Sequence, residues 1–272
     1  MSLPNLSELQ HKPRKELEPG PETLDGIYCL DKNAETTPCD ASVVLKRAAL
    51  PAMPGEFDEA AAFMIDRVRQ DSFMGHAVPR KQCTFGSVQY KTYELFSDPN
   101  VWPSLVKKVL TVTRSFAEML GVPNPHEYTG VHANFYPDGD ASVARHADDE
   151  KQLIEGAPIF SFTYLAEDNA FLAREFTVWK KPRGADHIDG RGKLAEVTLY
   201  SGDLLIMQGN MQKFFLHSIE KQKGKPVAPR LNFTVRKFVP KKSKKREPDT
   251  EAVTESATES ATETPSKGTV AE

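Results

Sequence analysis

Residues 130–165 read GVHANFYPDGDASVARHADDEKQLIEGAPIFSFTYL, and this stretch decides the fold class. Short runs rich in Val, Ile, Phe and Tyr alternate in it with turn-forming clusters such as PDGD and EGAP. The same pattern continues to residue 238. We expect strands at 130–136, 142–148, 158–165, 171–179, 194–200, 203–208, 213–219 and 230–238. About eight short strands in succession indicate a sandwich, a barrel or a jelly roll.

Two helical patterns precede these strands. In 55–70 the apolar residues Phe57, Ala60, Ala61, Met64 and Val68 recur at helical spacing, and in 103–120 they are Leu105, Val109, Val112, Phe116 and Leu120. Gly121 is a natural stop for the second helix. Helices followed by strands predict an α+β fold in which the helices pack on one face of a sheet.

The ends of the chain differ from its middle. Residues 1–40 are rich in Pro, Glu, Lys and Thr, and we expect them to be mostly flexible. Residues 241–246 are a basic cluster, KKSKKR, and 247–272 are an acidic tail that contains the polar repeat TESATESATETP. Such a repeat has too little apolar surface to offset its ordering entropy, so we expect the tail to be disordered. One folded domain is therefore predicted over about 41–240.

Composition excludes several classes of protein. The 272 residues contain no run of 18 apolar residues and no apolar N-terminal stretch, which argues against a transmembrane helix and a signal peptide. Three scattered cysteines, Cys29, Cys39 and Cys83, are too few for a disulfide framework, so an intracellular compartment is expected. The net charge of −3 is low, and any nucleic-acid surface must be a local patch. We expect a monomer without membrane association.

The last predicted strand carries a charged face. Arg230, Asn232, Thr234 and Arg236 alternate with Leu231, Phe233 and Val235, so the polar side chains point the same way. Guanidinium groups bind carboxylates bidentately, and two of them on one face could bind one small dianion. The alternative is an ordinary amphipathic strand with its arginines in water.

Two earlier patterns carry metal-binding chemistry. His146 and Asp148 point the same way if they lie on a strand, and His217 follows on another strand-like run. Two histidines and one carboxylate are the ligand set of non-haem Fe(II) oxygenases. Taken alone, His-x-Asp is more often a solvated pair, but its order before His217 and the arginine-bearing strand strengthens the prediction. Asn134 and Tyr136 also share a face, and either could bind a carboxylate or belong to a turn and the core.

Taken in order, Asn-x-Tyr, His-x-Asp, a distant His and Arg-x-Asn-x-x-x-Arg resemble the AlkB family of Fe(II)/2-oxoglutarate dioxygenases. The likeness extends from about Val78 to Phe238. Its nuclear DNA-repair branch in eukaryotes is the most similar, through VPRKQCTFG (78–86), RHADDE (145–150), GAPI (156–159), GDLLIM (202–207) and APRLNFTVRK (228–237).

The resemblance implies a double-stranded β-helix, or jelly-roll, core. It implies that the catalytic iron ligands are His146, Asp148 and His217, and that 2-oxoglutarate is held by Asn134, Tyr136, Arg230, Asn232 and Arg236. Arg230 and Asn232 are expected at the distal carboxylate and Arg236 near the metal. The implied reaction consumes O2, converts 2-oxoglutarate to succinate and removes an N-methyl group from a nucleic-acid base as formaldehyde. The bases implied are 1-methyladenine and 3-methylcytosine, in DNA rather than RNA.

The family resemblance identifies the substrate-binding residues less completely than the metal and 2-oxoglutarate residues. A base must leave its stack to reach the iron. Asp149 and Glu150 are candidates for reading an exocyclic amine, although both could be solvated turn charges. Candidates for phosphate contact are Arg80 and Lys81, candidates for stacking are Phe85, Tyr90 and Tyr93, and candidates for a wedge into the duplex are Phe73 and Met74. For these the alternatives are a solvated face or core packing.

Two further segments bear on function. Residues 166–171, AEDNAF, depart from the related sequences, which place an Arg just before the Phe. We therefore keep open the same chemistry on another substrate, such as RNA, a protein side chain or a small molecule. A non-catalytic binding module on the same fold is a separate alternative, against which the complete triad and both arginines argue. The stretch PKKSKKR (240–246) indicates a nuclear localisation signal or a nucleic-acid-binding arm, or simply a solubilising segment. His132 and His187 are not expected to be ligands.

Overall fold

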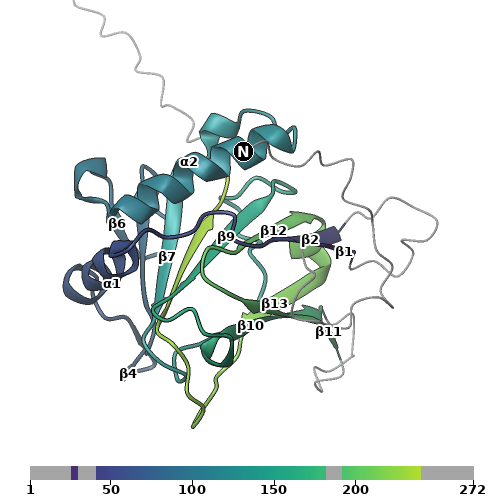
Figure 1. Cartoon of the computed structure of the whole chain (residues 1–272). Helices are drawn as coiled ribbons and strands as arrows, with labels where there is room; N and C mark the ends of the chain where they lie inside the picture. Colours follow the sequence, from purple (N-terminus) through teal and green to yellow (C-terminus); the bar gives the residue numbers. More distant parts are fainter. Residues whose placement is uncertain (1–25, 30–40, 182–191, 240–272) are drawn as a thin grey trace, which may run out of the picture. The chain divides into compact units, whose positions relative to one another are not determined.

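The computed structural model describes residues 26–29, 41–181 and 192–239 (Figure 1). The helices are α1 (Glu56–Arg67), α2 (Ser104–Met119) and the short α3 (Met211–Phe214), with single 3-10 turns at η3 (Pro99–Val101), η4 (Pro125–Glu127) and η5 (Ala170–Leu172). The strands are β1 (Gly26–Cys29), β2 (Ala41–Lys46), β3 (Ser72–Phe73), β4 (His76–Ala77), β5 (Lys81–Gly86), β6 (Glu94–Phe96), β7 (Gly130–Tyr136), β8 (Val143–His146), β9 (Ile159–Leu165), β10 (Arg174–Lys180), β11 (Lys193–Leu199), β12 (Leu204–Gly209), β13 (Phe215–Ile219) and β14 (Arg230–Val235).

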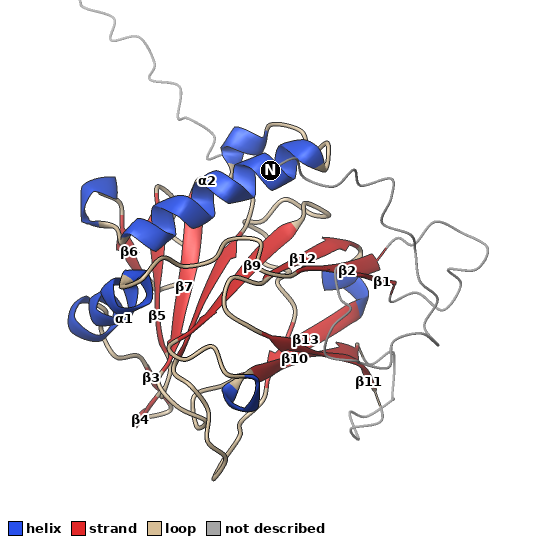
Figure 2. Ribbon diagram, viewed as in Figure 1, coloured by secondary structure: helices blue, strands red, loops and turns tan. Residues whose placement is uncertain are grey.

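Two sheets form the core of the molecule (Figure 2). The larger has the order β1-β2-β12-β9-β14-β7-β5-β6, and the smaller has the order β11-β10-β13-β8. Nearly all neighbouring strands are antiparallel, and the pair β5–β6 is parallel. Strands β3 and β4 form a separate hairpin. This arrangement confirms the predicted α+β fold with a double-stranded β-helix core.

Helices α1 and α2 cover one face of the larger sheet (Figure 1). The apolar side of α2 is buried, with Leu105, Val109 and Phe116 among its packed residues. The helix ends at Met119, two residues before the predicted stop Gly121, which has a left-handed φ of 67°. The amides of Gly121 and Val122 donate to the carbonyls of Glu118 and Ala117, a pairing that satisfies two of the last helical carbonyls.

Two hydrophobic clusters hold the layers together. One fills the space between the helices and the larger sheet, and the other lies between the two sheets. Alternation along β14 gives the two faces of the larger sheet different characters. Leu231, Phe233 and Val235 belong to the first cluster, and the polar residues between them face away from the helices. The side of the larger sheet away from the helices is thus free to build a polar site.

The predicted elements match the structure well from residue 130 onward. Strands β7, β9 and β14 begin within a residue of the positions predicted for them. One correction concerns 213–219, where the short helix α3 occupies the start of the predicted strand. A second concerns β2 and β5, which lie in the part of the chain that showed helical patterns and were not predicted.

Most of the predicted flexible and charged ends lie outside the described residues. Within 1–40, Gly26–Cys29 forms β1 and pairs antiparallel with β2. The basic cluster 241–246, the acidic tail 247–272 and His187 all lie outside the described residues. Among the helices that are described, none has the length and apolar character needed to cross a membrane.

Candidate active site

Three predicted metal ligands come together between the two sheets. His146 ends β8, and it stands directly opposite His217 in the antiparallel pairing of β8 with β13. Their ring centres are 4.2 Å apart. Asp148 follows β8 by two residues, and the candidate ligand atoms of all three side chains lie within 4.8 Å of one another. Such a cluster of two histidines and one carboxylate fits a single Fe(II) ion.

The protonation states of the three residues also suit a metal. Burial and the neighbouring His146 lower the pKa of His217 to about 3, and burial lowers the pKa of His146 as well. Both rings are therefore neutral at pH 7, as metal ligands must be. His146 Nδ1 lies 2.9 Å from the carbonyl oxygen of Ala144, which can only accept, so the proton is on Nδ1 and Nε2 keeps its lone pair.

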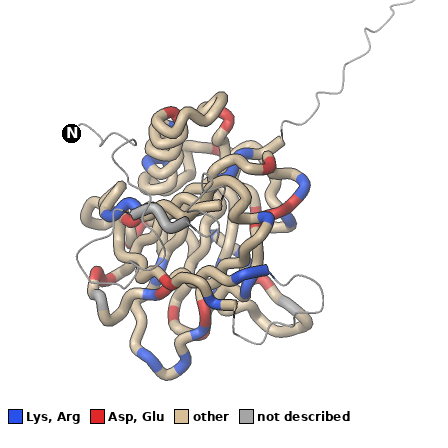
Figure 3. The backbone as a smooth tube through the Cα atoms, turned by 90° about the vertical axis from the view of Figure 1, so that its right-hand side faces the viewer, with Lys and Arg blue, Asp and Glu red and all other residues tan. Residues whose placement is uncertain are grey.

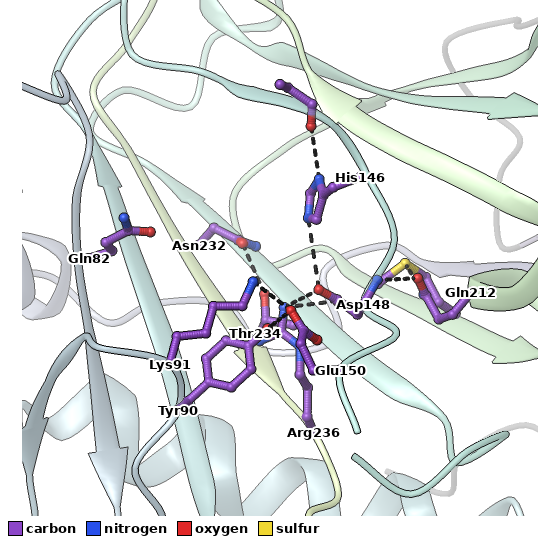
Figure 4. A network of polar contacts seen from close by, with 12 residues as sticks. Gln82, Tyr90, Lys91, His146, Asp148, Glu150, Gln212, Asn232, Thr234 and Arg236 are labelled. Atoms are coloured by element: carbon purple, nitrogen blue, oxygen red, sulfur yellow. Dashed lines mark hydrogen bonds and ion pairs between the residues drawn. The ribbon is translucent and has the colours of Figure 1, made fainter. Parts of the chain in front are cut away.

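Asp148 is ionised and held by an arginine (Figure 4). It is 4% exposed, and burial alone would raise its pKa. The charge of Arg236 outweighs that effect and, with His217 and His146, holds the pKa below its usual value. Arg236 Nη2 donates to both carboxylate oxygens, at 2.9 and 2.8 Å. The arginine thus fixes the carboxylate beside the two histidines.

The polar face of β14 extends away from this cluster. Arg230 lies directly across from Tyr136, and Asn232 lies across from Asn134, in the antiparallel pairing of β14 with β7. The same face therefore holds the side chains expected for 2-oxoglutarate, with Arg236 at the metal end and Arg230 at the far end. The Asn232 amide donates to Ser161 Oγ and to the carbonyl of Phe162, both at 2.8 Å.

Arg230 is a buried cation with unused donors. Its side chain is 2% exposed, and its Nη2 donates to Thr163 Oγ1 at 3.0 Å. Its Nε and Nη1 are buried and have no hydrogen-bond partner among the described residues. Unpaired buried donors are costly, and a ligand carboxylate would satisfy them. The distal end of the row therefore fits the second carboxylate of 2-oxoglutarate.

A cavity of ≈ 290 Å³ lies over this row. Its described lining is strongly cationic, because Asp148 is its one acidic residue while its basic residues are Arg80, Lys91, Arg145, Arg230 and Arg236. The lining also includes His146, His217, Asn134, Tyr136 and Asn232. Such a cavity favours a small anion bound against the three ligand residues.

Comparisons with known proteins agree with this chemistry. The profile of the 2OG-Fe(II) oxygenase superfamily matches residues 59–236. The chain belongs to this superfamily. It is thus a dioxygenase that uses Fe(II) and 2-oxoglutarate.

Several relatives of the oxygenase are known. The DNA oxidative demethylase ALKBH2 of Bos taurus is 27% identical over 211 residues, which are 76% of this chain and 71% of the relative. ALKBH2 of Homo sapiens is 27% identical over 210 residues, 76% of this chain and 75% of the relative. The alkB homolog 3 of Mus musculus is 28% identical over 174 residues, 64% of this chain and 56% of the relative. These relatives confirm the resemblance to the AlkB family and its eukaryotic DNA-repair branch.

One solved structure, that of OsALKBH1, is also similar to the oxygenase. It has 19% sequence identity and a TM-score of 0.46, and the match covers 72% of this chain and 96% of that chain.

The two acidic candidates for substrate contact have partners in the structure. Glu150 Oε1 accepts a hydrogen bond from the Tyr90 hydroxyl at 2.9 Å and pairs with Lys91 Nζ at 2.5 Å. Asp149 pairs with Lys181 Nζ at 2.9 Å, and its side chain is 61% exposed. Neither is among the described residues that line the cavity, and Glu150 ties the loop that carries Tyr90 to the loop that follows Asp148.

Two of the aromatic and basic candidates for substrate contact, Tyr93 and Arg80, line the cavity. Tyr93 lines the cavity and stacks on His132, with ring centres 4.8 Å apart. Arg80 also lines the cavity, where it donates to the Ser142 carbonyl at 3.0 Å and to Gln82 at 2.9 Å. It contacts the wall of the oxygenase site and is already engaged there.

The prediction that Phe85 contacts the substrate is wrong. Phe85 is fully buried in the cluster between the helices and the larger sheet, and it packs on Phe63, Phe96 and Trp102 with ring centres 5.4 to 5.9 Å apart. Because residues alternate along β5, Phe85 faces the helices while Gln82 faces the cavity. Phe85 is therefore a core residue and cannot stack on a substrate base.

Two residues near the site were not foreseen. Arg174 begins β10, is 1% exposed, and donates to the Ala141 carbonyl at 2.6 Å and to the Glu220 carbonyl. It lies beside Tyr136, 5.6 Å from the ring centre, so the oxygenase has a buried arginine shortly after the unusual 166–171 segment. His132, which was considered only as a possible ligand, lines the cavity, and no local pattern marks either role.

Proposed function

We propose that this oxygenase is an oxidative demethylase of N-alkylated nucleic-acid bases, of the 1-methyladenine and 3-methylcytosine type, and that it repairs DNA. The observation that carries the proposal is the cavity, whose lining combines the three metal ligands and the two β14-side arginines with the rings of Tyr90, Tyr93 and His132. Aromatic side chains next to a metal suit a flat base that has left its stack. Relatives with matching sequence over most of the chain are named DNA oxidative demethylases.

The residues of the chain perform distinct tasks in this reaction. Bound Fe(II) supplies the oxidation of the N-methyl group with O2, coupled to decarboxylation of 2-oxoglutarate. His146, Asp148 and His217 hold the ion, and Arg236 keeps the Asp148 carboxylate ionised and oriented. Arg230 and Asn232 orient 2-oxoglutarate, with Asn134 and Tyr136 beside them. The larger sheet and its buried side chains exclude bulk water from this end of the cavity.

The surface supports a local contact with nucleic acid rather than a broad one. Basic and acidic residues are interspersed along the chain (Figure 3). The hairpin β3–β4 presents Met74 at its tip, where the side chain is 83% exposed and φ is 51°. A short apolar tip of this kind suits a wedge between base steps. The hairpin and the Tyr90–Tyr93 loop are the proposed contact elements.

The decisive experiment is incubation of the protein with Fe(II), ascorbate, 2-oxoglutarate and methylated oligonucleotides, followed by mass spectrometry. Methylated DNA should lose 14 Da per base (about the mass of one CH₂ unit) while formaldehyde and succinate accumulate. Methylated RNA and a methylated peptide are parallel arms. Turnover of RNA or peptide without DNA would replace the proposed substrate, and no turnover of any substrate together with no uncoupled succinate would indicate a binding module.

We further propose that the protein acts in the nucleus. The basic cluster 241–246 has the composition of a nuclear localisation signal. Replacing its five basic residues with Gln in a fluorescently tagged full chain should shift the protein from nucleus to cytoplasm. An unchanged nuclear signal would assign localisation to another part of the chain.

A further inference from the structure

The loop that carries Asp148 is held on both sides. Arg236, which directly follows β14, holds the Asp148 side chain on one side. On the other side lies α3, the four-residue helix that directly precedes β13 and therefore precedes His217. The residue of α3 that meets the loop is Gln212 (Figure 4).

Gln212 contacts the loop through its side chain. Its Oε1 accepts a hydrogen bond from the Asp148 backbone amide at 2.8 Å, and its Nε2 lies 3.2 Å from the sulfur of the buried Met207. Both ends of the amide are thus engaged, which fixes its orientation. Because Asp148 is 4% exposed, no bulk water replaces Gln212 as the partner of that amide.

The backbone of Gln212 forms a second link. Its carbonyl accepts from Lys181 Nζ at 2.9 Å, and the same ammonium pairs with the Asp149 carboxylate at 2.9 Å. Two consecutive loop residues, Asp148 and Asp149, are therefore tied to one residue of α3. These links add to the pairing of β8 with β13 in connecting the segment that ends in His217 to the loop that carries Asp148.

We propose that Gln212 is a positioning residue for the metal site, which sets the distance between Asp148 and His217 from outside the ligand set. Groups that orient metal ligands without touching the metal change metal affinity by about 10- to 100-fold when they are removed. Gln212 has this role because it bonds the backbone of one ligand and lies five residues before another. The inference concerns metal binding and does not depend on which substrate the enzyme demethylates.

The test is anaerobic titration of the metal-free full chain with Fe(II), in the presence of 2-oxoglutarate, followed by the visible absorption of the chelate. Gln212→Met keeps the length of the side chain and removes the acceptor, and its Kd for Fe(II) should rise about 10- to 100-fold. Gln212→Glu keeps an acceptor oxygen and should restore most of the affinity. At saturating iron, kcat of Gln212→Met should return close to the wild-type value, because the ligands themselves are intact.

Lys213→Met is the matched control. Lys213 is the next residue of α3, is exposed, and lies with its Nζ 5.4 Å from the ring centre of Phe214. Its replacement should leave the Kd for Fe(II) unchanged. If Gln212→Met fails to fold, Lys181→Met is tested in its place. This variant removes only the contacts of Lys181 with the Gln212 carbonyl and with Asp149, and it should weaken iron binding several-fold. Wild-type iron affinity in Gln212→Met, or in Lys181→Met where that variant is the test, would overturn the proposal.

Discussion

At the scale of single residues, the site is governed by two buried arginines with different partners. Both keep Nε and Nη1 without a hydrogen-bond partner, but Arg236 is paired with the Asp148 carboxylate, whereas Arg230 forms no ion pair with a described carboxylate. A buried charge with unused donors is stabilised when a ligand of opposite charge binds. Arg230, at the start of β14, and Arg236, just after its end, are thus expected to respond differently to substitution.

Arg230→Met should raise the KM for 2-oxoglutarate. A charge-assisted hydrogen bond contributes about 1.5–3 kcal/mol, which corresponds to about a ten- to hundred-fold change. Arg230→Lys should restore the KM only in part, because an ammonium is a point charge and not a planar fork. Steady-state kinetics of succinate release measure both. An unchanged KM in Arg230→Met would show that the strand does not bind the distal carboxylate.

Asp148→Ala should abolish turnover and also lower stability. Removing one partner of a buried ion pair leaves Arg236 uncompensated, and the free energy of unfolding should fall by about 3–5 kcal/mol. The double variant Asp148→Ala/Arg236→Met removes both charges and should recover much of that loss while staying inactive. Urea denaturation separates the two effects, and equal stability of the single and double variants would argue against the pair.

The sequence predicted the His146–Asp148 pair and the row Arg230, Asn232 and Arg236 from local spacing. The strand expected to carry the pair ends at His146, however, and the distant His217 was added only through the order of the motifs and the family resemblance. Arg174 carries no such signal, since its burial depends on carbonyls of Ala141 and Glu220 that only the tertiary fold brings to it.

At the scale of elements, β5 illustrates how alternation sorts core from site. Its sequence KQCTFG places Cys83 and Phe85 on the helix side and Gln82 on the cavity side. That alternation is visible in the sequence and would have assigned Phe85 to the core. The pairing of β5 with β7 and of β2 with β12 was not predictable, because it joins segments far apart in the chain.

Phe85→Ala and Tyr93→Ala should therefore have opposite profiles. Phe85→Ala opens a cavity in the core and should lower the free energy of unfolding by about 3–5 kcal/mol. Its KM for a methylated oligonucleotide should stay close to wild type. Tyr93→Ala should change the free energy of unfolding little. It should raise that KM, because the lost stacking costs about 1–3 kcal/mol of binding free energy. Melting curves and steady-state kinetics distinguish them, and a raised KM with full stability for Phe85→Ala would return that residue to the substrate site.

At the scale of the whole molecule, we expect the two ends of the chain to contribute unequally to stability. Deleting 247–272 removes a polar repeat, and the melting temperature should stay within a few degrees of the full chain (about the effect of 1 kcal/mol or less). Deleting 1–40 also removes Gly26–Cys29, which pairs with β2 along four residues. That deletion should lower the melting temperature clearly more. The reverse order, measured by differential scanning calorimetry, would contradict this division of the chain.

The cross-strand placement of His146 and His217 has a consequence for the free protein. β8 is a four-residue strand at the edge of the smaller sheet, and among the described strands its one neighbour is β13. A metal bound by both histidines links β8 to β13. Loss of the metal therefore lowers the free energy needed to separate these two strands locally. An opened edge strand exposes unpaired backbone groups that recruit other chains. Without iron, the amides of β8 should thus exchange faster and the protein should aggregate sooner, in addition to losing its activity.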